Sequence, residues 1–224
     1  LGDEVVGVTH ECDWPPEAAA KAVVTASLIQ TGDLTSAEID RLVAETAWDG
    51  GPLYAIDEER WAEVEADVVV MQELCKVCAV STDQVEGVLR ARPLEVEVLD
   101  FSPSTIDGIG ETIRAVGARL GTDGEAEELT AGMRSRLDRV ASALAGVESY
   151  PRVFVTEWLE PPYSAGHWVP DMVSAAGGID VAGTSGEPSH RMRWPDVAAL
   201  EPDVVVLAPC GFDLDRTLSE VVPL

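Results

Sequence analysis

The chain has 224 residues, of which 46% are hydrophobic, so it can bury a sizeable core and is not a disordered polypeptide. Forty-one acidic residues face fifteen basic ones and give a net charge of −26, which excludes nucleic acid as a partner because binding it requires lysine and arginine to neutralise phosphates. The acidic, lysine-poor composition has two explanations that the sequence leaves open: a high-salt environment that screens self-repulsion, or a GC-rich genome that favours arginine over lysine.

The first half of the chain alternates short strands with helices. Strands are expected at residues 4–9, 23–26, 67–72 and 95–99, and helices at residues 16–21, 35–48, 57–64, 81–90 and 104–120. The β-branched run at 67–72 is typical of a parallel strand that is covered on both faces. This alternation predicts an α/β fold with a mostly parallel sheet.

A long helix is expected over residues 122–147. Apolar residues recur along it at three- and four-residue steps, which indicates one buried face: Leu129, Met133, Leu137, Val140, Leu144 and Val147. Thr122 followed by Glu125 predicts a capping box at its start. A rod of about 37 Å is longer than one compact lobe needs. We therefore interpret residues 122–149 as a bridging helix between an N-terminal lobe (1–121) and a C-terminal lobe (150–224).

After this helix the same alternation resumes. Strands are expected at residues 152–156 and 203–208, helices at 169–176 and 195–200, and loops at 157–163 and 183–189. The stretch from Glu63 to Val70, which leads to Cys75, resembles the stretch from Leu200 to Val206, which leads to Cys210. Each has a short helix, an acidic turn, a buried strand and a sulfur-bearing loop, so the two lobes are expected to be versions of one unit.

The segments that follow the expected strands hold most of the residues suited to ligand binding. In open parallel sheets ligands bind beyond the carboxyl ends of the strands, where these segments lie. The candidate ligand-binding residues are Cys12, Trp14, Gln72, Trp158, Tyr163, His167, Trp168 and Phe212. Aromatic, sulfur and carboxylate groups in these segments together suit a large, flat, partly apolar ligand.

Other roles for these residue types are weaker. His10 with Cys12, or Cys75 with Cys78, could bind a metal, but the spacing fits no closed zinc site and we expect no metal centre. Cys75 and Cys78 could also form a redox pair, although no thioredoxin-like context surrounds them. Trp61 and Trp194 lie within helical patterns and are expected in the core. With neither a nucleophile elbow nor a Walker-type glycine loop, we do not expect an enzyme.

Four blocks of the sequence resemble the cobalamin-type substrate-binding proteins of ABC importers, within the metal-chelate class. The blocks are His10-Glu11-Cys12-Asp13-Trp14-Pro15-Pro16, the strand at 66–70 with residues 72–79, Pro161-Pro162-Tyr163-Ser164-Ala165-Gly166, and residues 201–206. The resemblance implies two Rossmann-like lobes joined by one long helix, in a monomer. It also implies capture of a cobalamin-like corrinoid, as cargo rather than cofactor, for delivery to a permease. Haem or a ferric siderophore is the alternative ligand, and a thiol- or metal-dependent enzyme the alternative class.

The resemblance assigns roles to particular residues. Trp14 matches a cleft aromatic that contacts corrin, and the segment 158–163 matches a second contact. Each lobe of the family also carries a glutamate that docks on permease arginines. Glu59 matches the first, whereas Pro195 stands at the second and leaves Asp196 as the substitute. The family implies an extracytoplasmic, membrane-associated location, and its members extend beyond both ends of this sequence, which looks truncated.

Overall fold

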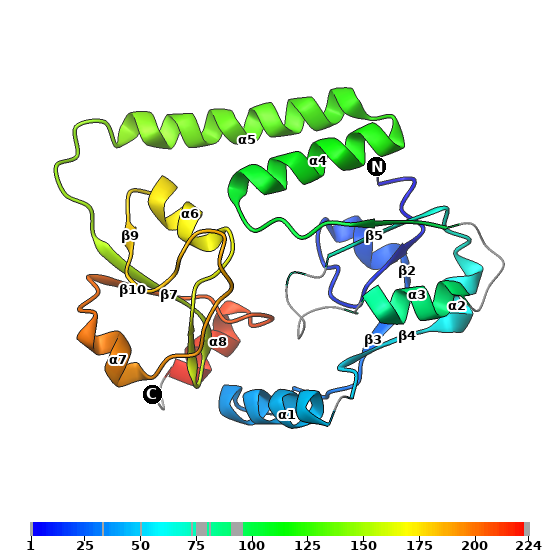
Figure 1. Cartoon of the computed structure of the whole chain (residues 1–224), viewed down its shortest axis with the longest axis horizontal. Coiled ribbons are helices and arrows are strands. Elements are labelled where there is room, and N and C mark those ends of the chain that lie inside the picture. The colour runs from blue at the N-terminus through cyan, green and yellow to red at the C-terminus, as the bar shows by residue number, and fades with distance from the viewer. Residues whose placement is uncertain are drawn as a thin grey trace. The chain divides into compact units, whose positions relative to one another are not determined.

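The computed structural model describes residues 2–32, 34–49, 51–72, 74, 80, 82–90 and 96–221. The chain folds into two compact units (Figure 1). The first unit comprises Leu1–Leu34 and Glu38–Ser102, and the second comprises Thr35–Ala37 and Pro103–Leu224. Within the described ranges, no helix combines the length and the apolar character needed to cross a membrane.

The strands of the first unit pair two by two. The parallel pairs are β1 (Gly7–Val8) with β2 (Ala22–Val23) and β5 (Val68–Met71) with β6 (Glu97–Asp100), and the antiparallel pair is β3 (Thr25–Ser27) with β4 (Tyr54–Ile56). The helices are the 3-10 helix η1 (Pro16–Ala20), α1 (Ser36–Trp48), α2 (Glu58–Glu63) and α3 (Thr82–Arg90). The first two residues of α1, Ser36 and Ala37, belong to the second unit. The core gathers Val24, Trp61, Val85 and Val88, so the expectation that Trp61 is a core residue is confirmed.

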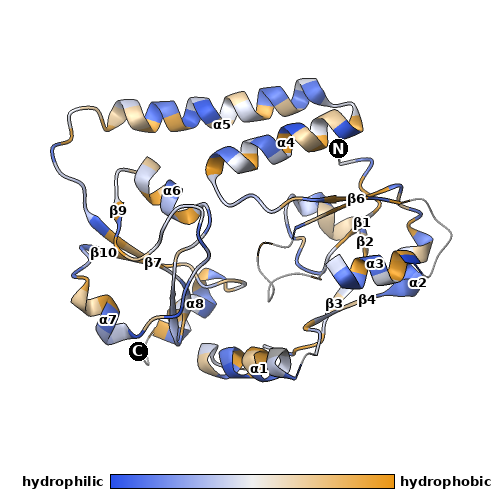
Figure 2. Ribbon diagram, viewed as in Figure 1, coloured by the Kyte–Doolittle hydropathy of each residue, from blue (hydrophilic) through white to orange (hydrophobic). Residues whose placement is uncertain are grey.

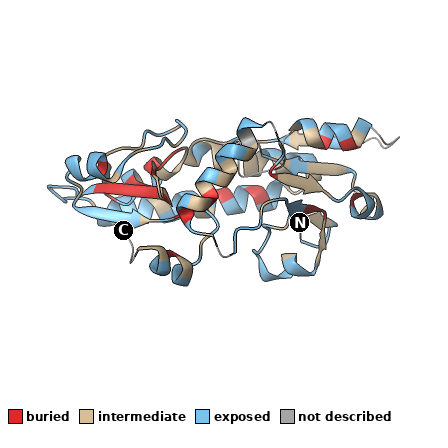
Figure 3. Cartoon of the chain, turned by 90° about the horizontal axis from the view of Figure 1, so that it is seen from below, coloured by how far each residue is buried: buried red, intermediate tan, exposed pale blue. Residues whose placement is uncertain are grey.

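The second unit is built around one strand, β7 (Arg152–Leu159). Its neighbours are β10 (Val204–Leu207) and β9 (Ile179–Asp180), which are parallel to it, and β8 (Pro162–Ser164), which is antiparallel. Phe154, Thr156 and Leu159 on β7 are fully buried. Figure 3 shows one strand drawn largely in red, the colour of buried residues. The helices are α4 (Ile106–Leu120), α5 (Asp123–Ala143), α6 (Val169–Ala175), α7 (Trp194–Ala199) and α8 (Leu214–Val221). Most strand pairs are parallel, as the sequence predicts.

The expected loop at 157–163 is wrong, because β7 continues to Leu159 and turns back into β8. The strand bulges between Thr156 and Trp158. The Thr156 hydroxyl contacts the carbonyls of both Trp158 and Tyr163, which satisfies the backbone at the bulge. Proline residues in this stretch suggest a loop, but here they lie at the turn and in the short strand that follows it.

Helix α5 is confirmed, but its expected buried face is only partly correct. Leu129, Val140 and Val147 are 50%, 41% and 43% exposed. The buried residues are instead Ala126 and Thr130, and hydrophilic residues cover much of the helix (Figure 2). Small residues are buried because α4 approaches α5 closely at its glycines.

The expected capping box at the start of α5 is also wrong. The Thr122 side chain makes no capping hydrogen bond. Its amide donates to Gly117 O at 2.8 Å, and Gly121 ends α4 in the left-handed conformation with φ 69°. The tight α4–α5 connection holds Thr122 at φ −117° and ψ 41°, which is not the extended backbone that a side-chain cap requires.

The expectation that the strand at 67–72 is covered on both faces is wrong at Val70 of β5, and the expected burial of the strand at 203–208 is wrong for β10. Val70 is 53% exposed, and Val204, Val205 and Val206 are 41–46% exposed. In the described sheet β10 is hydrogen-bonded only to β7, so it is an edge strand. A β-branched run therefore predicts the strand correctly, but it does not report whether the strand is covered.

The internal resemblance in the sequence has a structural counterpart. Helix α2 and helix α7 each have six residues and end in a right-handed capping residue. Glu65 and Glu201 follow with left-handed backbones, at φ 45° and 47°. Strands β5 and β10, of four residues each, come next. The two segments therefore share one local backbone path, which supports the interpretation of two related units.

A glycine substitution tests the α4–α5 contact. A Cβ at Gly117 would lie 2.5 Å from Ala126 Cβ and 3.1 Å from Thr122 O, whereas a Cβ at Gly132 in α5 meets nothing within 4 Å. We expect Gly117→Ala to lower the free energy of unfolding by about 1–3 kcal/mol through overpacking. The control Gly132→Ala should raise it by roughly 0.5–1 kcal/mol through helix propensity. Urea unfolding followed by circular dichroism measures both, and equal stabilisation would contradict the close contact.

Candidate functional site

Two of the expected ligand-binding aromatics meet at the carboxyl end of the β7 and β10 strands. Trp158 lies on β7, Phe212 follows β10, and their ring centroids are 5.2 Å apart at an angle of 59°. The Trp158 indole donates from Nε1 to Ser36 O at 3.1 Å. Both residues are half-buried. The aromatic pair is therefore held by packing and by a hydrogen bond, in keeping with a tilted arrangement that aromatic rings favour.

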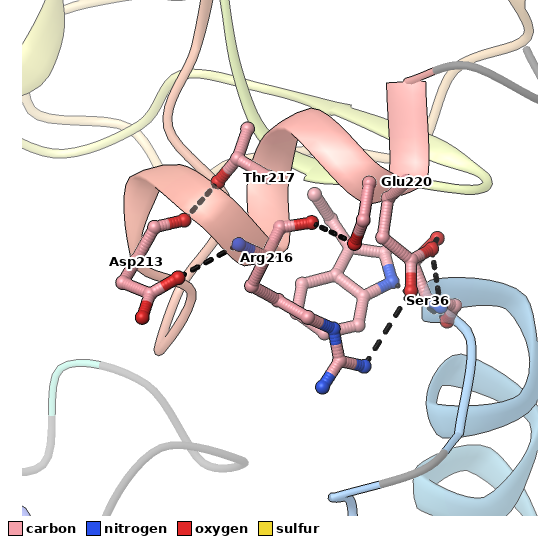
Figure 4. A network of polar contacts seen from close by, with 7 residues as sticks. Ser36, Asp213, Arg216, Thr217 and Glu220 are labelled. Atoms are coloured by element: carbon pink, nitrogen blue, oxygen red, sulfur yellow. Dashed lines mark hydrogen bonds and ion pairs between the residues drawn. The ribbon is translucent and has the colours of Figure 1, made fainter.

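Polar residues of α8 adjoin this aromatic pair. The Arg216 guanidinium lies over the Phe212 ring, 4.4 Å from the centroid, and pairs with Glu220 at 3.4 Å. Asp213 caps the helix, because its carboxylate accepts from Arg216 N and its carbonyl accepts from the Thr217 hydroxyl, both at 2.7 Å (Figure 4). Helix α8 and these partners are not among the elements and residues expected from the sequence.

Tyr163, His167 and Trp168 lie on the chain that leaves β7. Tyr163 on β8 faces Trp158 in the antiparallel register. His167 has a left-handed backbone, φ 54°, and its amide donates to Glu187 O at 2.7 Å. The ring centroids of His167 and Trp168 are 6.3 Å apart. His167 and Trp168 thus form a second pair of rings in the same unit, half-buried and next to the start of α6.

Glu157 and Cys210 also lie at this end of the sheet. The Cys210 amide donates to Glu157 O at 3.0 Å, and Glu157 Oε1 accepts from Gly166 N at 2.9 Å. Cys210 as a whole residue is exposed. Partial desolvation of its thiol, followed by the nearby Glu157 carboxylate, raises the pKa of Cys210 above its ordinary value. The pairing of β7 with β10 brings the two residues together. In the sequence each follows an expected strand, and this position is the signal that could have predicted their proximity.

The first unit places Cys12 and Trp14 in the segment after β1. Trp14 is 80% exposed and immediately precedes Pro15 and η1. Cys12 is exposed, and its Sγ lies 3.2 Å from Thr9 Oγ1. The His10 ring is fixed by Thr25 Oγ1, 2.7 Å from Nδ1, while the Glu11 carboxylate lies 3.4 Å from Nε2, which makes no hydrogen bond. This segment thus presents a large aromatic surface to solvent beside a fixed histidine.

Gln72 lies exposed at the carboxyl end of β5. Cys75 and Cys78, the alternative metal or redox pair, lie outside the described residues. Across the described ranges, His, Cys, Asp and Glu side chains do not gather in any group of three that could hold a metal. The arrangement in each unit is therefore aromatic and polar, with chemistry suited to binding an extended organic ligand.

The two expected docking carboxylates have different surroundings. Glu59 is exposed in the first turn of α2. Asp196, also exposed, accepts two hydrogen bonds of 2.7 Å from Arg193, from Nε and from Nη2. The hydrogen bond to Arg193 holds the pKa of Asp196 below its ordinary value. A bidentate pair of this kind leaves Asp196 already engaged by a neighbouring arginine.

The sequence pattern described as Periplasmic binding protein matches residues 1–221, so the chain belongs to that family. Proteins named cobalamin-binding protein in two strains of Halobacterium salinarum are 29% identical over 167 residues. That stretch covers 72% of this chain and 45% of each relative, so the chain spans less than half the length of the curated relatives it matches.

Solved structures show the same fold. A periplasmic vitamin B12 binding protein of Vibrio cholerae has a TM-score of 0.63 and 17% identity, covering 100% of this chain and 78% of that one. A periplasmic heme binding protein from Pseudomonas aeruginosa has a TM-score of 0.68 and 17% identity, covering 97% and 68%. These likenesses show the α/β binding-protein fold that is expected from the sequence.

The chemistry of Cys210 is testable by alkylation. Glu157→Gln removes the negative charge that disfavours the thiolate, so the pKa of Cys210 should fall and its alkylation by iodoacetamide at pH 8 should become faster. Peptide mass spectrometry follows Cys210 alone. Glu187→Gln, at an exposed position, is the matched control and should leave the rate unchanged. An unchanged rate in Glu157→Gln would show that the carboxylate does not act on the thiol.

Proposed function

We propose that this chain is the substrate-binding protein of an ABC importer. It captures a cobalamin-like corrinoid outside the cytoplasm and delivers it to a membrane permease, without catalysis of its own. Its membership of the Periplasmic binding protein family supports the class of function. The similarity to the cobalamin-binding protein of Halobacterium salinarum supports the ligand. In this proposal the corrinoid is cargo, and no resident cofactor is required.

The exposed Trp14 side chain is the observation that carries the proposal. The Trp14 indole is 80% exposed, so it does not contribute the hydrophobic free energy that a buried aromatic side chain would contribute. A bound ligand with a flat, partly apolar face recovers that free energy when it covers the indole. The Trp158–Phe212 pair offers a second aromatic surface of the same chemistry. A macrocycle is the ligand class that such surfaces suit.

The polar residues of the proposed set suit the periphery of a corrinoid. The amide of Gln72, the hydroxyl of Tyr163 and the imidazole of His167 are hydrogen-bond donors and acceptors. Groups of this kind can bind the amide side chains at the edge of a corrinoid. Cys12 and Trp168 complete the proposed set. In this proposal the aromatic residues provide most of the buried area, while the polar residues set the orientation of the ligand.

Haem or a ferric siderophore is the second candidate ligand. The His167 imidazole favours haem, because histidine is a common axial ligand of haem iron. A thiol-dependent enzyme is less well supported. The raised pKa of Cys210 keeps the thiol protonated at neutral pH, whereas a thiol nucleophile must be deprotonated.

A ligand panel with two tryptophan variants tests the proposal. Calorimetry with cyanocobalamin, haemin and a ferric siderophore should give binding at micromolar concentration with cyanocobalamin. Trp14→Ala should weaken that binding by about tenfold or more, since buried aromatic anchors contribute strongly. Trp48→Ala is the control, because Trp48 on α1 is 91% exposed and has no proposed role. Equal losses in the two variants, or no binding of cyanocobalamin, would contradict the proposal.

The proposal includes an asymmetric docking surface. The exposed carboxylate of Glu59 can meet a permease arginine directly, whereas a permease arginine that approaches Asp196 competes with Arg193. Exposed charge contacts of this kind mainly set orientation and encounter rate. The first unit therefore makes the stronger contact, and docking should tolerate the loss of Asp196 better than the loss of Glu59.

Uptake assays decide this asymmetry. Glu59→Ala should reduce permease-coupled uptake more than Asp196→Ala, and neither should change ligand affinity. Glu63→Ala controls for the loss of any exposed carboxylate from α2 and should leave uptake near the level of the unmodified protein. Equal losses of uptake in Glu59→Ala and Asp196→Ala would contradict the asymmetry. Weaker ligand binding in Glu59→Ala would contradict a role of Glu59 in docking alone.

A further inference from the structure

The N-terminus of α1 is capped by a residue far away in the sequence. Ser36, the first residue of this helix, is only 3% exposed. Its amide and its hydroxyl both donate to Glu220 Oε2, at 3.0 Å each, across 184 residues (Figure 4). The first amides of a helix lack partners within the helix, and a carboxylate there is favoured by the helix dipole. Glu220 therefore satisfies buried donors that would otherwise be unpaired.

Glu220 is held in turn by Arg216. Nη2 of Arg216 lies 3.4 Å from the other carboxylate oxygen of Glu220, one helical turn along α8 (Figure 4). The side chains of Arg216 and Glu220 are 26% and 13% exposed, so solvent screens the pair less than a surface ion pair. The same guanidinium lies over the Phe212 ring, 4.4 Å from its centroid. One cation thus contacts both the carboxylate and the aromatic pair.

The contacts close into a ring of five residues. Phe212 packs on Trp158 with the ring centroids 5.2 Å apart, and the Trp158 indole donates to the carbonyl of Ser36 at 3.1 Å. Ser36 is thus donor to Glu220 and acceptor from Trp158. We call Ser36, Glu220, Arg216, Phe212 and Trp158 the five-residue ring. Its members come from α1, α8, β7 and the segment after β10.

We propose that Glu220 is a positioning residue for ligand binding, which acts through Ser36 and Arg216 to fix the orientation of the Trp158–Phe212 pair. The indole hydrogen bond fixes one edge of Trp158, and the stacked guanidinium fixes Phe212. An aromatic pair that is ordered before the ligand arrives loses less conformational entropy on binding. The inference rests on the proposed ligand-binding function of Trp158 and Phe212, and it adds the residues that set their geometry.

Three variants at α8 test the role of Glu220. Glu220→Ala leaves the Ser36 donors unpaired and should weaken cyanocobalamin binding about tenfold. Glu220→Gln keeps a carbonyl oxygen that can accept from Ser36, and it should stay within about threefold of the unmodified protein. Asp215→Ala, an exposed carboxylate on the same helix, is the control and should show no change.

Two further measurements do not depend on the ligand. Hydrogen exchange of the amides at residues 36–39 should become faster in Glu220→Ala, and acrylamide should quench Trp158 fluorescence more strongly. Subtracting the emission of the matching Trp158→Phe protein isolates the Trp158 signal. Glu220→Gln should restore both values, and Asp215→Ala should leave them unchanged.

The outcomes separate the positioning role from the proposed function. If the unmodified protein binds neither cyanocobalamin nor haemin, the proposed function fails, and exchange and quenching alone decide the positioning of Trp158. If it binds, a folded Glu220→Ala protein with normal affinity and normal quenching overturns the inference, even where its unfolding temperature is lower. Weaker binding and stronger quenching, both rescued by Glu220→Gln, support it.

Discussion

The second unit depends on hydrogen bonding along both edges of β7. Strand β10 pairs with residues 153–156 on one edge, and β9 and β8 share the other edge. This pairing leaves Phe154, Thr156 and Leu159 with no exposed surface. It also determines which residues emerge at the carboxyl end of the sheet. Glu157, Trp158 and the segment carrying Cys210 and Phe212 are neighbours because these strands are in register.

Much of the fold was predictable, because hydrophobic periodicity and strand–helix alternation depend on local sequence. The helices at α1, α4 and α5 and the central strands are where those patterns place them. Tight contacts were not predictable. The burial of Ala126 instead of Leu129 depends on the close approach of Gly117, and the hairpin after Trp158 depends on a hydroxyl at the bulge. Both are consequences of packing, which periodicity does not encode.

The candidate site, like the fold, was only partly predictable from the sequence. The rule that ligands bind beyond strand ends identified Trp158 and Phe212, which are in contact. It could not identify Glu220, which reaches Ser36 across 184 residues, because a pairing of that length leaves no local pattern. Arg216 was missed for the same reason. Candidate ligand-binding residues are thus easier to find from sequence than the residues that hold them in place.

The related helices α2 and α7 show how one backbone path can carry different surfaces. At the start of α2, Asp57 pairs with Arg60, whereas at the start of α7, Arg193 pairs with Asp196, so the order of the charges is exchanged. A net charge of −26 attracts any cationic partner over a long range, but salt screens that attraction beyond about a Debye length. Ion pairs in direct contact therefore still distinguish one partner from another at salt concentrations that screen the attraction of the net charge. An exchange of charge order at matching helix starts makes the two units chemically distinct, and a partner with fixed charges can then recognise one orientation of the protein over the other.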